Sequence, residues 1–184
     1  MDAIKFSLAL VLLFSNSNFM DILKFENLLG KHVSTAKDFT GCDFNGNNIQ
    51  GKNFTMNIYT NDELINKYFY GMKYNFITIL TDDQEIIQSI TIHFHELINR
   101  EFYDTFNKDY GKPDHIQVVE NRRTVSESFG KGFFQHLKKS TFDLREGTFE
   151  ENPLYIIWKR KHFQIKAFLR QQNMSEITFS ISAD

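Results

Sequence analysis

The sequence predicts an α+β domain in which helices pack on one face of an antiparallel sheet. Two observations predict the sheet. Residues 86–95 alternate apolar and polar side chains, and residues 154–182 hold three short apolar stretches separated by polar turns. A third observation predicts a helix, because Ile98, Phe102 and Phe106 recur every four residues just before a glycine. A period of two is typical of a half-buried strand, and a period near 3.6 is typical of an amphipathic helix.

The start of the chain has the pattern of a secretory signal. Lys5 precedes a nine-residue apolar run, Phe6–Phe14, which is followed by small and polar residues. This run is too short to cross about 30 Å of hydrocarbon as a helix, and it has the length of a signal core. We therefore expect residues 1–17 to be a signal peptide that is cleaved near Asn18. Two alternatives are a buried N-terminal helix and a true start at Met20.

The number of cysteines indicates the compartment in which the protein resides. Cys42 is the only cysteine, so the mature chain has no internal disulfide. A bacterial periplasm or exterior tolerates such a chain, whereas a small eukaryotic secreted domain is more often rich in disulfides. The sequence predicts an exported bacterial protein. Residues 18–184 then form one domain, with no membrane span after removal of the signal.

The elements of the first half follow from local patterns. An apolar stripe that ends in glycine predicts a short helix over residues 22–29. Residues 36–53, rich in Gly and Asn, are expected to form a long exposed loop. Residues 61–69 have helical spacing behind a capping Asn or Asp. Residues 74–80 and 86–95 are expected to pair as a hairpin across a polar turn.

The second half begins with the clearest helix. It is expected over residues 97–110, and the glycine that follows, with a proline beyond it, is a good stop signal. Residues 115–120 are expected to form a strand, and residues 128–140 a helix weakened by two glycines. The remaining strands are expected to form a meander over residues 154–160, 163–169 and 176–182.

The strand and the helix at the centre of the chain predict the core. A helix that directly follows a strand can bury both apolar faces by folding back across the sheet. We therefore expect five side chains to pack together out of contact with water: Ile90, Ile92, Phe94, Phe102 and Phe106.

A short motif occurs twice. Residues 25–31 and 106–112 share the pattern F-x-x-x-apolar-G-K, and their glycines lie 81 positions apart. A repeat of about 80 residues is consistent with this spacing. The spacing is therefore compatible with a domain built from two tandem halves, residues 20–96 and 97–184.

The order of elements resembles a known group of proteins. A helix, a glycine turn and strands are followed by a second helix, which ends in Tyr110-Gly111-Lys112-Pro113, and by further strands. Over residues 20–183 this order resembles small exported bacterial proteins of the β-lactamase-inhibitor-protein-like and SmpA/OmlA-like kind. Members of that group leave a curved sheet face open and bind other proteins without catalysis. The resemblance implies the same architecture and role for this chain, and it transfers no site residue.

The charge balance and the motifs that are missing from the sequence narrow the function. Twenty-one Lys and Arg against 23 Asp and Glu leave a net charge of −2, which argues against a dedicated nucleic-acid binder. The sequence contains no glycine-rich phosphate loop, no G-x-S-x-G elbow and no H-E-x-x-H pair. We therefore expect no cofactor, and a protein or a small ligand as the partner.

Five residues are candidates for a binding face. Trp158 has the side chain type that is enriched at interface hot spots, and Lys159 and Lys161 are expected to be charges at its rim. Thr91 and His93 lie on the wetter side of the strand over residues 86–95. Trp158 has an alternative position in the core, because it shares its strand parity with apolar neighbours.

Two histidines are the candidates for a metal site. His93 and His95 alternate onto one face of their strand, where they can chelate a divalent ion. The other interpretation is two surface histidines, because two neighbouring ligands alone do not make a site.

These observations predict an exported, non-enzymatic binding protein at the bacterial cell envelope. It is expected to recognise a protein or ligand through the open face of its sheet. The first alternative is a metal-dependent hydrolase that uses His93 and His95, so the sequence leaves an enzyme open. The second is a cytoplasmic protein of the immunity or inhibitor type that starts at Met20.

Overall fold

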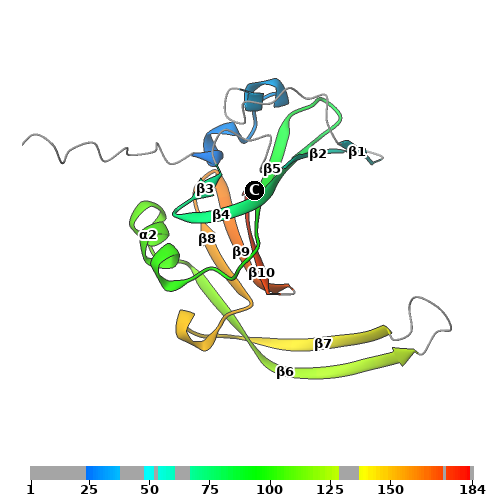
Figure 1. Cartoon of the computed structure of the whole chain (residues 1–184), viewed down its shortest axis with the longest axis vertical. Coiled ribbons are helices and arrows are strands. Elements are labelled where there is room, and N and C mark those ends of the chain that lie inside the picture. The colour runs from blue at the N-terminus through cyan, green and yellow to red at the C-terminus, as the bar shows by residue number, and fades with distance from the viewer. Residues whose placement is uncertain are drawn as a thin grey trace, which may run out of the picture.

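The computed structural model describes residues 24–37, 48–51, 54–60, 67–128, 137–171 and 173–182 of the chain (Figure 1). The expected signal peptide and its cleavage site, the alternative start at Met20 and Cys42 all lie outside these residues.

Antiparallel strands pair into one large sheet. Its order is β1-β2-β4-β5-β10-β9-β8-β6-β7, with β3 paired to β4. The strands are β1 (Asn48–Gln50), β2 (Thr55–Thr60), β3 (Tyr68–Phe69), β4 (Met72–Thr81), β5 (Ile87–Phe94), β6 (His115–Ser128), β7 (Leu137–Glu146), β8 (Tyr155–Lys159), β9 (Phe163–Gln171) and β10 (Met174–Ile181). Both halves of the chain contribute strands, and they meet where β5 pairs with β10.

The expected α+β class is wrong, because the molecule is mostly antiparallel sheet. Among the described elements there is one α-helix, α2 (Arg100–Tyr110). The other helical elements are 3-10 turns of three or four residues: η1 (Phe25–Leu28), η2 (Val33–Thr35) and η3 (Phe149–Glu151). In the part of the chain that the structure describes, the helical layer is therefore α2 with these turns, and Ala36 and Lys37 also have α-helical backbone. The helix expected over residues 22–29 is η1, as far as it is described.

The helix expected over residues 61–69 is also wrong where the structure describes it. Tyr68 and Phe69 form β3, which pairs with Met72 and Lys73 of β4. Between them Tyr70 and Gly71 both have positive φ, 47° and 81°. Two such residues in succession form the type of tight turn that matches the twist of paired strands. Residues 61–66 lie outside the described part of the chain.

The helix expected over residues 128–140 is replaced at both ends by strand. β6 continues through Ser128, and β7 begins at Leu137 and pairs with it. Gly130 and Gly132 disfavour a helix here, and long-range pairing with β6 outweighs the helical spacing of the apolar residues. Residues 129–136 lie outside the described part of the chain.

The expected strands 74–80, 86–95, 115–120 and the three-strand meander are confirmed. The helix expected over residues 97–110 is confirmed as α2. The Asn99 side chain accepts a hydrogen bond of 2.9 Å from the Phe102 amide at its start. Gly111 ends the helix with a φ of 73°, in the region that glycine adopts without a Cβ penalty.

The core lies between α2 and one face of the sheet, as the sequence predicts. Ile90, Ile92, Phe94, Phe102 and Phe106 are all at most 2% exposed and belong to one apolar cluster. Phe94 and Phe102 make an edge-to-face contact with centroids 5.7 Å apart. η1 and the β3 hairpin complete the cover, because Phe25 and Phe69 join the same cluster.

The sheet bends strongly. Figure 1 shows β8, β9 and β10 running steeply across the direction of β4, with α2 on the side that β3 also covers. β6 and β7 leave this body as a long hairpin that extends away from α2.

Candidate functional site

The side of the sheet opposite α2 forms the candidate site. We call it the open face and define it by the side chains that alternate with the core residues along β4, β5, β8, β9 and β10. Each of these side chains is half-buried or exposed, whereas their neighbours in sequence on the other side are mostly buried. The members are Phe76, Thr78, Leu80, Ser89, Thr91, His93, Tyr155, Ile157, Lys159, Gln164, Lys166, Phe168, Glu176, Thr178 and Ser180.

Strand register aligns these residues in two rows across five strands. Cα partners place one row in the order Phe76, His93, Glu176, Phe168 and Tyr155. The adjacent row runs Thr78, Thr91, Thr178, Lys166 and Ile157. Directly opposite side chains on one face of antiparallel strands lie close enough to interact, so each row is a continuous strip.

His93 is held on three sides in the first row. Its ring stacks on Phe76 with centroids 4.1 Å apart. Nδ1 lies 3.3 Å from Oε2 of Glu176, and Nε2 lies 3.2 Å from Oγ1 of Thr78. The Glu176 carboxylate is thus within ion-pair distance of Nδ1, and Nε2 shares a hydrogen bond with the Thr78 hydroxyl. These contacts fix the orientation of the imidazole.

The other end of the strip is aromatic and cationic. Tyr155 of β8 and Phe168 of β9 stack with centroids 5.0 Å apart. Nζ of Lys166 lies 4.0 Å from the centre of the Tyr155 ring, a distance at which a cation and a ring face attract each other.

Thr91 and Thr178 share a hydrogen bond of 2.9 Å between their hydroxyls in the middle of the face.

The two candidate metal ligands do not form a chelating pair on this face. His93 lies within β5, but β5 ends at Phe94, so His95 follows the strand and is exposed. Both ring nitrogens of His93 already have protein partners within 3.3 Å. Among the described residues no three His, Cys, Asp or Glu side chains are grouped to hold a metal ion. His136, a further histidine of the sequence, lies outside these residues.

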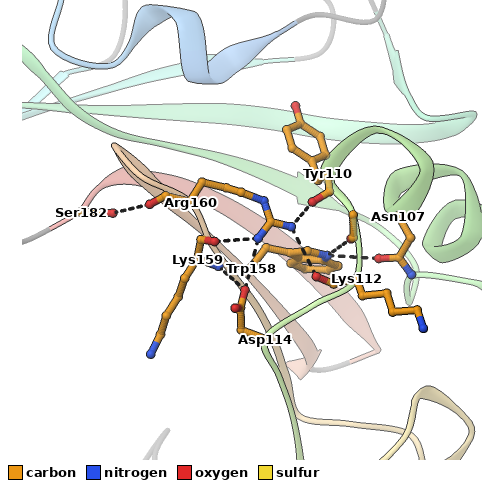
Figure 2. Close-up of polar contacts among 9 residues, drawn as sticks. Asn107, Tyr110, Lys112, Asp114, Trp158, Lys159, Arg160 and Ser182 are labelled. Carbon is orange, nitrogen blue, oxygen red and sulfur yellow. Dashed lines mark hydrogen bonds and ion pairs between the residues drawn. The ribbon is translucent and has the colours of Figure 1, made fainter.

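Trp158 lies on the core side of β8 and is 2% exposed, which is the alternative position that strand parity allows. Its ring packs edge-on against Phe106 of α2, with centroids 5.0 Å apart. Nε1 donates to Oδ1 of Asn107 and to the carbonyl of Gly111, both at 3.1 Å (Figure 2). The indole thus joins β8 to the end of α2, and it points away from Thr91 and His93.

Arg160 completes the connection between β8 and α2. Its guanidinium donates to the backbone carbonyl of Tyr110, the last residue of α2, and to that of Lys112 just past the helix (Figure 2). A cation at this position satisfies carbonyls that lack a partner in the helix and interacts favourably with the helix dipole.

Asp114 accepts a hydrogen bond of 2.7 Å from the Lys159 amide and lies 3.2 Å from Nη1 of Arg160. The hydrogen bond from Lys159, together with the Arg160 charge, lowers the pKa of the Asp114 carboxyl.

The two candidate lysines are separated by the end of β8. Lys159 is the last residue of that strand and lies at the margin of the open face. Lys161 is exposed in the following turn and lines a pocket of about 350 Å³ with Glu26, His162 and Phe163. The structure therefore brings Thr91 and His93 together on β5. It places Lys159 three strands away, on β8 at the margin of the same face, and Trp158 and Lys161 elsewhere.

The sequence did not predict a second polar cluster, which lies around His32. His32 Nδ1 accepts a hydrogen bond of 3.3 Å from the Ser34 amide and lies 2.8 Å from its hydroxyl. Nε2 lies 3.0 Å from Oε2 of Glu85, and all three residues line a pocket of about 300 Å³. His32 caps η2, and its ion pair with Glu85 is exposed. No local pattern could have joined Glu85 to His32 and Ser34, because it lies in a distant part of the chain.

Within the part of the chain that the structure describes, no helix has the length and apolar character needed to cross a membrane. Comparisons of the chain with protein-family models, with curated proteins and with solved structures found no match.

Proposed function

We propose that this chain is a binding protein that recognises another protein through the open face of its sheet. The observation that supports this most is the strip of His93, Glu176, Phe168 and Tyr155, in which His93 lies 3.3 Å from Glu176 and Phe168 stacks on Tyr155. A preorganised surface loses little conformational entropy on binding. Aromatic side chains, tyrosine above all, are enriched where protein interfaces gain most of their affinity.

The shape of the molecule favours a protein over a small ligand. Small-molecule sites are concave, and neither of the two pockets described above is lined by a residue of the open face. The open face instead offers a broad surface with aromatic groups beside charges of both signs, Glu176 and Lys166. We therefore infer a partner surface with an apolar centre and an acidic group opposite Lys166.

We further propose that binding takes place at the bacterial cell envelope. The support is Lys5 and the apolar run Phe6–Phe14 at the start of the chain. N-terminal sequencing of the protein from its host is expected to begin within a few residues of Asn18. A protein that retains Met1 and stays in the cytosol would contradict export.

The alternative of a metal-dependent hydrolase receives less support. A metal at His93 would have to displace Glu176 or Thr78 from the imidazole. In the binding account, changing both His93 and His95 to Ala leaves the metal content of the purified protein unaffected. An equivalent of zinc that is lost in this double variant would favour the hydrolase.

Photo-crosslinking in the host tests the proposal. A photo-reactive phenylalanine analogue replaces Phe168 on the open face, and in a matched control it replaces Tyr68, which is 52% exposed on β3. Position 168 is expected to capture one discrete protein that position 68 does not capture. The proposal fails if position 168 captures nothing, or if both positions capture the same set of proteins.

A further inference from the structure

The β6–β7 hairpin extends beyond the rest of the sheet. β8 pairs with β6 only at His115, Ile116 and Gln117, whereas β6 and β7 pair from Gln117 with Glu146 out to Ser128 with Leu137. We call residues 118–128 and 137–146 the arm. Figure 1 shows it projecting from the body of the molecule. Over this length the arm is a ribbon of two strands.

The arm carries apolar side chains that its own two strands do not cover. Phe142 is 43% exposed and Leu144 is 37% exposed. Leu144 lies opposite Val119, and Phe142 lies opposite Arg122, so these side chains share one face of the ribbon. A two-stranded ribbon alone is marginally stable in water. The arm therefore gains stability from any surface that covers this face or extends the ribbon.

The two edges of the arm differ in regularity. The register with β7 skips Glu120 and Val125, so both extra residues lie on β6. Bulges of this kind disrupt pairing along the strand that contains them. β7 has no such interruption between Leu137 and Glu146, and it is the last strand of the sheet. Of the two edges, β7 is therefore suited to accept another strand.

We propose that two copies of the chain pair through β7 in antiparallel fashion, with Thr141 of each copy opposite Thr141 of the other. Two-fold symmetric pairing makes an isologous contact, in which one patch meets itself. The arm suits such a contact because its strands carry five basic and four acidic residues: Arg122, Arg123, Lys138, Lys139 and Arg145 against Glu120, Glu127, Asp143 and Glu146. Neither sign dominates, so the arm does not favour a highly charged partner.

The charge pattern of β7 selects the register. Pairing centred on Thr141 places Lys139 of each copy opposite Asp143 of the other, which gives two attractive pairs. Centring on Phe142 gives two attractive pairs, Lys138 with Glu146, but also two repulsive pairs, Lys139 with Arg145, so the two effects oppose each other. Centring on Asp143 places two aspartates opposite each other. Centring on Ser140 creates no pair of opposite charges.

The same register brings the exposed rings together. With Thr141 on the two-fold axis, Phe142 lies opposite Ser140 of the second copy and diagonal to its Phe142. Diagonal neighbours on one sheet face remain within reach of aromatic side chains. The pairing thus shields the Phe142 rings from water, and it gives the backbone N–H and C=O groups at the outer edge of β7 hydrogen-bond partners.

A cysteine trap tests the register in the full chain. In a Cys42→Ser background, Thr141→Cys places two thiols directly opposite each other, whereas Asp143→Cys does not. Mild oxidation is expected to give a disulfide-linked dimer with Thr141→Cys and little with Asp143→Cys. Equal yields from both variants, or none from either, would overturn the proposal.

Sedimentation equilibrium with charge exchange tests the contact without cysteine. Lys139→Asp or Asp143→Lys alone is expected to raise the dimer dissociation constant about tenfold, because two attractive pairs become repulsive. The double variant restores both pairs and the affinity, although Asp143 has also lost its 3.3 Å contact with Arg123. Ile49→Ser on β1, at the other edge of the sheet, is the control and is expected to change nothing. A chain that stays monomeric, or a double variant no better than the single ones, contradicts the proposal.

Discussion

At the scale of single residues, adjacent side chains along β5 have different roles. Ile92 has no exposed surface and belongs to the core, whereas Thr91 and His93 on either side of it face outwards and contact β10. Alternation along a strand produces this division. A substitution on the core side of the sheet therefore tests the stability of the fold, and a substitution on the open face tests binding.

Phe102 and Thr91 provide the first such comparison. Phe102→Ala removes a buried ring and leaves a cavity, so we expect a loss of about 3–5 kcal/mol in the free energy of unfolding. Thr91→Ala removes one half-buried hydroxyl bonded to Thr178, and we expect a loss of about 1 kcal/mol or less. Urea unfolding measures both. Small, equal losses would mean that α2 does not pack on this sheet.

Trp158 provides a second prediction. Trp158→Phe keeps an apolar ring in the core but removes the donor that Asn107 and Gly111 share. The loss of a hydrogen bond costs about 0.5–1.5 kcal/mol, and the smaller ring leaves a cavity in the core that adds to this loss. Amide hydrogen exchange is expected to quicken at the end of α2 as the unfolding free energy falls. Tyr155→Phe, an aromatic change on the open face, is the control and should stay within about 0.5 kcal/mol of the wild type. A Trp158→Phe variant as stable as this control would contradict the role of the indole.

At the scale of elements, side-chain hydrogen bonds and an ion pair join the end of α2 to β8 (Figure 2). Asp114 accepts from the Lys159 amide, and Arg160 lies between this carboxylate and the carbonyls at the end of the helix. The sequence shows Gly111 and Pro113 as stop signals. It does not show that a residue some 50 positions later caps the same helix.

This junction should respond to pH. Because the pKa of Asp114 is lowered in the folded state, the folded protein binds that proton more weakly than the unfolded chain does. The contribution to stability is therefore complete above the ordinary pKa of an aspartate, and it is lost as pH falls through the lower value of the folded state.

Asp114→Asn tests this linkage. The variant is expected to be less stable than the wild type near neutral pH and to lose less stability on acidification. Urea unfolding at several values between about pH 6 and pH 2 measures the difference. Parallel stability curves for the two proteins would exclude Asp114 as a source of the pH dependence.

Sequence patterns identified those elements whose partners lie close in the chain. The hairpin of β4 and β5, the meander of β8 to β10 and the helix α2 all follow from local periodicity and stop signals. The fold class failed because Tyr68 and Leu137 belong to segments with helical spacing. Their strands form through pairing with β4 and β6, and tertiary pairing outweighs local propensity.

At the scale of the whole molecule, one bent sheet has α2 on one face and the open face on the other. The sequence placed Thr91 and His93 on that face by alternation alone. It could not place Phe168, Tyr155 and Glu176 beside them, because the register of β8, β9 and β10 against β5 is a long-range property. Trp158 and Lys161 could not be assigned for the same reason, since hydrogen bonds to α2 and the turn after β8 decide where they lie.

The dissociation constant of the protein captured at position 168 tests the central claim most directly. Thr91→Arg places a long charged side chain in the middle of the open face, and Gln84→Arg makes the same charge change in the exposed turn between β4 and β5. The account predicts that Thr91→Arg weakens binding by at least about tenfold while Gln84→Arg leaves it unchanged. Unchanged binding by Thr91→Arg in a folded protein, or equal weakening by both variants, would contradict the assignment of the open face as the binding surface.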